Sequence, residues 1–118
     1  MDELLDRLVG KVGVDRSVAE KAVGIILAFL LKEGPSDKVQ ALINKMPGAE
    51  AVMQTAGSEG GFGMGGIMGV GTKLMAAGLS MDQMQGVTRE IIAYARDKAG
   101  EDTVGEIVGS IPGLGQFV

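Results

Sequence analysis

Apolar residues recur at the spacing of an α-helix along most of the chain, and glycines and prolines interrupt the pattern. The first apolar segment covers Glu3–Val12, where apolar positions fall three or four residues apart. Asp2 stands before this segment as a candidate helix cap, and Gly13 follows it as a candidate left-handed stop. The pattern therefore predicts a first helix over this range.

The second segment is apolar on nearly every side, which indicates a central, buried helix. Ser17 and Glu20 form a capping-box pattern at its start, and the apolar run Ala22–Leu31 follows. A Gly-Pro pair ends this helix at about Glu33, because proline disfavours helical backbone in the residue before it. Ser36 then predicts the cap of a third helix.

The third helix reaches about Met46, where a Pro-Gly pair ends it. The helical pattern of apolar residues then continues in the rest of the chain. A glycine-rich stretch separates the later helices from the earlier ones. Two of the later helices begin with a recognisable cap, Ser80 in a second capping box and Asp102 at the last helix. The later predicted helices are a short piece at Ala49–Thr55, Ile67–Ala77 closed by Gly78, a long helix from Ser80 to Lys98, and a last helix from Asp102 to Ser110.

The second half of the chain repeats the helix punctuation of the first half 65 residues later. The matches fall on helix breakers and on core positions, where a repeated fold requires them, and we interpret them as an internal duplication of a helical triplet. Convergent helix punctuation is the alternative explanation. The matched pairs include Gly13 with Gly78, Ile26 with Ile91, Phe29 with Tyr94, Val39 with Val104, and Pro47–Gly48 with Pro112–Gly113.

The predicted fold is therefore all-α: a pseudo-twofold, duplicated helical bundle of six or seven helices in a single domain over residues 1–118. The two halves cover about residues 2–54 and about residues 66–118. A Gly-rich linker of about residues 55–65 joins them. We expect Ile26 and Phe29 to pack against Ile91 and Tyr94 where the halves meet.

The glycine-rich residues 57–71 allow three interpretations: a dinucleotide-binding motif, a membrane-inserting segment or a tether between the halves. Gly61, Gly63 and Gly66 have the spacing of a dinucleotide-binding motif, but that motif must leave a strand, and no strand is predicted here. The uncharged stretch Gly60–Thr72 is shorter than the roughly 20 residues that a membrane-spanning helix needs. A tether between the halves is the interpretation that makes the fewest demands on the sequence, because glycine has the greatest backbone freedom and suits a flexible link.

Composition narrows the possible chemistry. The chain has no cysteine and no histidine, so it lacks thiolate nucleophiles, the usual general base and the commonest metal ligand. A net charge of −4 without a basic block disfavours nucleic acids and anionic membranes. The N-terminus is acidic where a signal peptide is basic. We expect a cytoplasmic protein that is not an enzyme and uses no cofactor or metal.

Charged residues on the predicted long helix form no catalytic pattern. Arg89 and Arg96 lie two turns apart on one face, with Glu90, Asp97 and Lys98 beside them. This arrangement is typical of a solvated helix face with local ion pairs, each worth about 0.2–0.5 kcal/mol.

Methionine supplies the one candidate contact surface. Seven of the eight methionines lie between Met46 and Met84. Methionine is flexible and polarisable, so methionine-rich surfaces accept varied apolar partners, although the same residues could instead fill an irregular core. The lone aromatic of the glycine-rich stretch could dock with them. The candidate contact residues are Phe62, Met64, Ile67, Met68, Leu74 and Met75.

The chain resembles bacterial helical proteins of the VcgC/VcgE type, a domain of unknown function. The resemblance rests on the capped apolar helix with "EKAV" at Glu20–Val23, the Pro-Gly breaks, the glycine-rich middle, the repeated second half and the ending "GEDTVGEIVGSIPGLGQFV". It covers nearly the whole chain and implies a small all-α bacterial protein without an assigned activity. It transfers no site residues.

The expected function is that of a non-enzymatic helical interaction module whose partner is a second copy of the chain or another protein. The alternative is a protein that binds an apolar small molecule or lipid in a groove between the two helical halves.

Overall fold

The helices begin and end close to the residues that the local sequence predicts. The computed structural model describes residues 2–46, 48–57 and 66–111, and within these it leaves the side chains of residues 54–57 and 66–68 undescribed. No strand occurs in these ranges, so the all-α prediction is confirmed. The elements are α1 (Asp2–Arg7), the π-helix η1 (Leu8–Val12), α2 (Arg16–Glu33), α3 (Ser36–Lys45), α4 (Ala49–Gly57), α5 (Gly66–Ala76), α6 (Met81–Ala99) and α7 (Glu101–Ser110).

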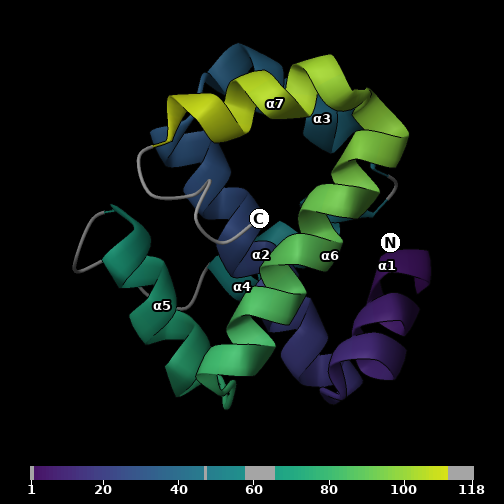
Figure 1. Cartoon of the computed structure of the whole chain (residues 1–118), viewed down its shortest axis with the longest axis vertical. Helices are drawn as coiled ribbons and strands as arrows, with labels where there is room; N and C mark the ends of the chain where they lie inside the picture. Colours follow the sequence, from purple (N-terminus) through teal and green to yellow (C-terminus); the bar gives the residue numbers. More distant parts are fainter. Residues whose placement is uncertain (1, 47, 58–65, 112–118) are drawn as a thin grey trace.

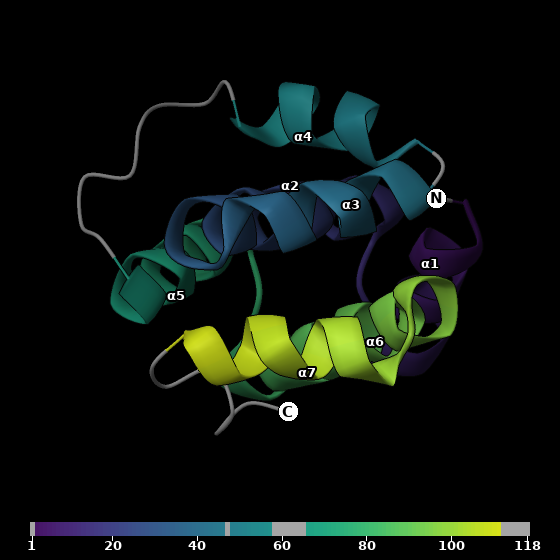
Figure 2. The same ribbon diagram turned by 90° about the horizontal axis from the view of Figure 1, so that it is seen from above.

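Two long helices, α2 and α6, form the centre of the bundle, where they contact and cross each other (Figure 1). The helices α1 and η1 pack on one side of this pair, and α5 packs on the other. Figure 2 shows α2 and α3 in one layer and α6 and α7 in a second layer, with α4 on the outer side of α2. The first helix of each half therefore contacts the long helix of the other half.

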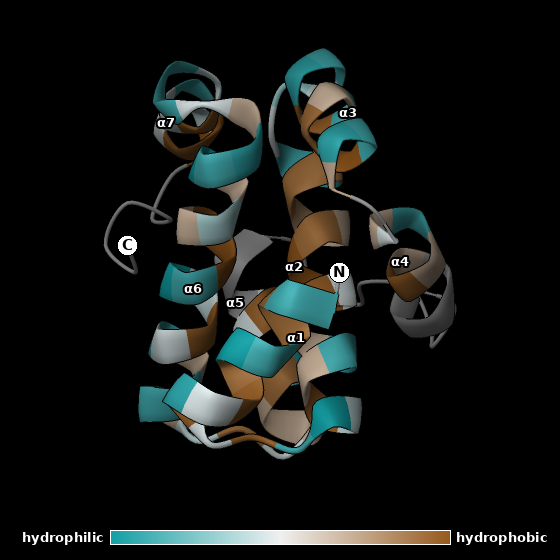
Figure 3. Ribbon diagram, turned by 90° about the vertical axis from the view of Figure 1, so that its right-hand side faces the viewer, coloured by the Kyte–Doolittle hydropathy of each residue, from teal (hydrophilic) through white to brown (hydrophobic). Residues whose placement is uncertain are grey.

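A single cluster of buried apolar side chains holds these layers together. Figure 3 shows the apolar positions concentrated on α2 and on the inner sides of the helices around it. Ile26, Phe29, Ile91 and Tyr94 are each no more than 2% exposed and belong to this cluster. The prediction that α2 is the central, buried helix is confirmed.

Glycines end two helices in the left-handed backbone conformation that their position requires. Gly13 has φ 84° and donates its backbone N–H to the carbonyl oxygen of Leu8 at 3.2 Å. Gly78 has φ 107° and follows α5 in the same way. A residue with a Cβ is strained at these angles, so both helix ends are encoded locally.

The capping predictions have mixed outcomes. The capping box at Ser80 is confirmed: the backbone N–H of Gln83 donates to Ser80 Oγ at 3.3 Å, and the backbone N–H of Ser80 donates to Gln83 Oε1 at 3.0 Å. The predicted cap at Asp2 is wrong, because α1 already includes this residue. The predicted caps at Ser17, Ser36 and Asp102 are wrong for the same reason. The residues at these N-caps are Asp15, Pro35 and Gly100, and none makes a side-chain capping bond.

We predict that Ser80→Ala lowers the free energy of unfolding by about 1 kcal/mol, because it leaves a helix N-terminal N–H without its acceptor. Urea denaturation measures the change. Ser36→Ala is the matched control, since Ser36 makes no capping bond, and its effect should stay within about 0.5 kcal/mol. Equal losses in the two variants would contradict the assignment of the cap.

The predicted linker begins later than the sequence indicates. Helix α4 continues to Gly57, so the first residues of the predicted linker, from Thr55, belong to a helix. Residues 58–65, which form the rest of the linker, lie outside the described residues. The tether interpretation therefore stays a prediction.

Candidate functional site

The candidate contact surface is built on α5, which packs against both α2 and α6. Val70 and Leu74 lie one helical turn apart and are buried, so this face of α5 anchors the helix to the core. After α5 the backbone N–H of Leu79 donates to the carbonyl oxygen of Leu74 at 3.2 Å, which closes the turn at Gly78. The opposite face of the last turn of α5 is left to solvent.

The six predicted contact residues divide into three groups in the structure. Met75 is 57% exposed and lies on the surface, whereas Leu74 is 2% exposed and belongs to the core. Ile67 and Met68 lie on α5, but their side chains are outside the described part. Phe62 and Met64 lie wholly outside it. Of the predicted surface, the described side chains therefore contribute Met75.

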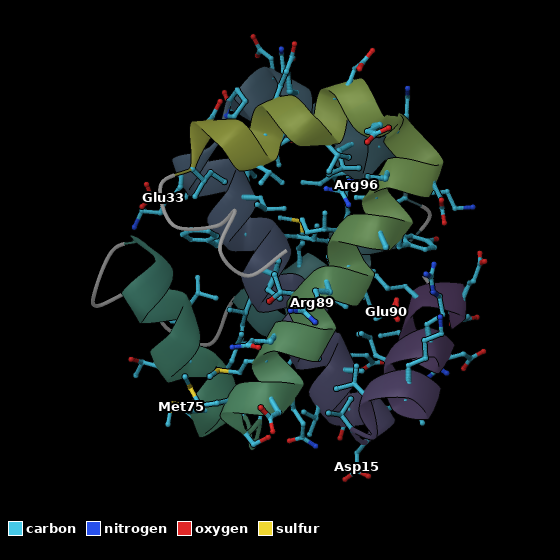
Figure 4. All side chains as sticks on the ribbon, in the orientation of Figure 1. Asp15, Glu33, Met75, Arg89, Glu90 and Arg96 are labelled. Atoms are coloured by element: carbon cyan, nitrogen blue, oxygen red, sulfur yellow. The ribbon has the colours of Figure 1, made fainter. Side chains whose placement is uncertain are left out.

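A second exposed methionine, Met81, was not among the predicted contact residues. Its side chain is 59% exposed and stands on the first residue of α6, directly after the Ser80 cap. The capping box could have identified it, because a residue that follows an N-cap at the surface lies in the exposed first turn. We call Met75 and Met81, which stand on either side of the turn between α5 and α6, the methionine corner; Figure 4 labels Met75 at this end of the bundle.

The other described methionines are covered by protein. Met46 is 2% exposed and Met84 is 6% exposed, and both belong to the core cluster. Met53 is half-buried against the same cluster. The prediction that methionines fill the core therefore holds for Met46 and Met84 and in part for Met53, but not for the methionine corner.

The ion pairs of Glu90 and Asp97 connect α6 to α1 and η1, and not to neighbouring residues of α6 itself. Arg7 contacts Glu90 at 3.2 Å and Asp97 at 3.6 Å, and Lys11 contacts Glu90 at 3.6 Å. Figure 4 shows Glu90 on the side of α6 that faces α1. The prediction of local pairs along the helix is wrong for Glu90 and Asp97, because the packing of α1 and η1 on α6 brings in cations that are distant in sequence, 83 residues away for Arg7 and Glu90.

Arg89 and Arg96 remain exposed on α6, as the prediction of a solvated face requires. Neither makes an ion pair with another described residue. Lys98 lies 5.4 Å from the ring centroid of Tyr94 and forms a cation–π contact. These contacts are those of a helix surface held by ion pairs and a cation–π interaction.

The charged groups of the described ranges form no metal site. No group of three or more aspartate and glutamate side chains in residues 2–46, 48–57 and 66–111 is arranged to hold an ion. The described surface offers apolar contact and the reactivity of the exposed thioethers of Met75 and Met81.

Comparisons with protein-family models, with curated proteins and with solved structures find no match to this chain. Within the described part, no helix has the length and apolar character needed to cross a bilayer.

Proposed function

We propose that this protein is a non-enzymatic helical interaction module that associates with a second copy of itself through the methionine corner. The observation that carries the proposal is the exposure of Met75 and Met81, which exceeds that of every other large apolar side chain in the described part. The next most exposed is Val9, at 40%. Both residues flank the short turn between α5 and α6, and apolar side chains gathered at one place on a surface mark protein contacts.

We also infer that the chain arose by duplication of one helical triplet. Support comes from the helix bounds, because α2 and α3 recur as α6 and α7 after 65 residues, to within one residue. Further support comes from the turns before them, where Gly13 and Gly78 both have positive φ. Matched core positions have the same burial; the pairs are Ala22 with Val87, Ile26 with Ile91, Phe29 with Tyr94, Val39 with Val104, and Met46 with Ile111.

The duplication strengthens the argument for the methionine corner. Counting back 65 residues, the positions of Met75 and Met81 correspond to Gly10 and Arg16, which are also exposed. The fold therefore accepts a glycine and an arginine at these places and does not require a large apolar side chain. Since the apolar character is not needed for folding, a contact outside the molecule is the better explanation for it.

The test is light scattering of the purified protein over a range of concentrations. Fully burying a methionine side chain contributes about 1.5–3 kcal/mol, and each 1.4 kcal/mol changes an equilibrium constant about tenfold. Replacing both Met75 and Met81 with glutamine should therefore weaken self-association at least about tenfold while leaving the fold intact by circular dichroism.

The matched control is Val9→Thr, which alters an exposed apolar side chain on η1 and should leave association unchanged. A wild-type protein that stays monomeric at every concentration would contradict the proposal. Native mass spectrometry of freshly purified protein tests the alternative function, because a co-purifying lipid would favour an apolar ligand between the halves over a clean dimer.

A further inference from the structure

Methionine is the main target for two-electron oxidants in this chain. The sequence contains no cysteine, no histidine and no tryptophan, and its single tyrosine, Tyr94, is 2% exposed. Peroxides attack sulfur before other protein groups, and without cysteine the thioether is the sulfur that remains. At the described surface, methionine is therefore the residue type that peroxides oxidise first.

Exposure separates two surface methionines from two buried ones among the described residues, and the half-buried Met53 lies between these pairs. Met75 and Met81 are 57% and 59% exposed, whereas Met46 and Met84 are 2% and 6% exposed. A buried thioether reacts only when the surrounding structure opens, and opening of core helices costs free energy that approaches that of global unfolding. The two exposed methionines lie on either side of the α5–α6 turn. Among the described methionines, oxidation therefore falls first at this end of the bundle, where Figure 4 labels Met75.

We propose that Met75 and Met81 are a modification site for hydrogen peroxide and that their oxidation dissociates the assembly. The sulfur lone pair forms a bond to one peroxide oxygen as the O–O bond breaks, and water leaves. Sulfur is oxidised by two electrons to the sulfoxide, and the peroxide is reduced by two. The sulfoxide turns an apolar side chain into a polar one, and methionine sulfoxide reductases reverse the change.

The surface position of Met75 and Met81 determines what their oxidation does to the protein. Each oxygen is added to a side chain that already faces solvent, so it disturbs no core contact and leaves the fold stable. The same oxygen prevents apolar burial between two copies, since a polar group that loses water without gaining a partner is costly to bury. This second part rests on the proposed function. Peroxide reacts with the free copy, in which both side chains face solvent, and the oxidised copy no longer re-forms the assembly, so self-association becomes sensitive to peroxide.

Site selectivity is tested by limited treatment with hydrogen peroxide, at a protein concentration low enough to keep the copies apart, followed by peptide mass spectrometry. Cleavage after Lys73 and Arg89 releases a peptide that contains Met75, Met81 and the buried Met84, so fragmentation compares all three in one molecule. Met75 and Met81 should gain oxygen at least about tenfold faster than Met84, because Met84 reacts only through local opening. Equal rates would overturn the assignment of the site.

The effect on assembly is tested by light scattering before and after the same treatment. Oxidised protein should show at least about tenfold weaker association, for the reason that applies to the glutamine variant. Met75→Leu/Met81→Leu keeps the apolar surface without the sulfur, so it should associate normally and resist peroxide. A wild-type assembly that survives oxidation of both residues overturns the switch while the proposed function stands. A protein that is monomeric before oxidation overturns the proposed function and the switch, and the peptide map still decides the modification site.

Discussion

Replacing Phe29 with alanine is expected to lower the free energy of unfolding by about 3–5 kcal/mol, the usual range for truncation of a buried aromatic side chain. Phe29 is 2% exposed and lies on α2, the helix that contacts most of the other elements. Alanine leaves a cavity in the core cluster, and the helices packed around it relax only in part. Chemical denaturation monitored by circular dichroism measures the loss.

Val9→Ala serves as the control for this truncation. Val9 is apolar but 40% exposed, so its change should stay within about 0.5 kcal/mol. A loss below about 1 kcal/mol for Phe29→Ala would show that α2 is not the centre of the core.

Replacing Gly34 with alanine should destabilise the protein by about 1–3 kcal/mol through overpacking. A Cβ at Gly34 would stand 2.8 Å from the carbonyl oxygen of Leu30 and 3.3 Å from side-chain carbons of Val39 and Ile111. The Leu30 oxygen belongs to the backbone and already accepts the N–H of Gly34 at 2.8 Å, so it cannot move aside without straining that bond. Thermal or urea unfolding measures the effect.

Gly105→Ala is the matched control, since a Cβ at Gly105 meets nothing within 4 Å in the middle of α7. Alanine has the higher helix propensity, so this variant should gain about 0.5–1 kcal/mol. If both alanine variants stabilise the protein, the close approach at the end of α2 is not a constraint.

Local sequence predicted most helix ends because their causes are local. The left-handed turns at Gly13 and Gly78 need only glycine, and the Ser80 capping box needs only two side chains three residues apart. The start of α2 could not be placed in this way. Arg16 is already helical, and its guanidinium contacts Asp2 at 2.7 Å and Asp6 at 3.1 Å. These partners belong to another helix, so the pattern around Ser17 contains no sign of them.

The candidate site shows the same division. The concentration of methionines around α5 is visible in the sequence, but neighbouring residues had opposite outcomes, with Leu74 in the core and Met75 at the surface. Helical periodicity places residues on faces, whereas the choice of the buried face depends on which neighbouring helices cover it. Contacts of α5 with α2 and α6 make that choice.

The sequence by itself determined that this protein is helical, where most of its helices stop, and that catalysis by histidine or cysteine is absent. Helix propensity and helix caps act over a few residues, and composition does not depend on the fold at all. Tertiary structure alone decided that Glu90 pairs with Arg7 and that Leu74, rather than Met75, is buried under the neighbouring helices. These outcomes depend on helices that pack together although they are distant in sequence. The free energy of such contacts comes from burial and proximity, which no local pattern contains.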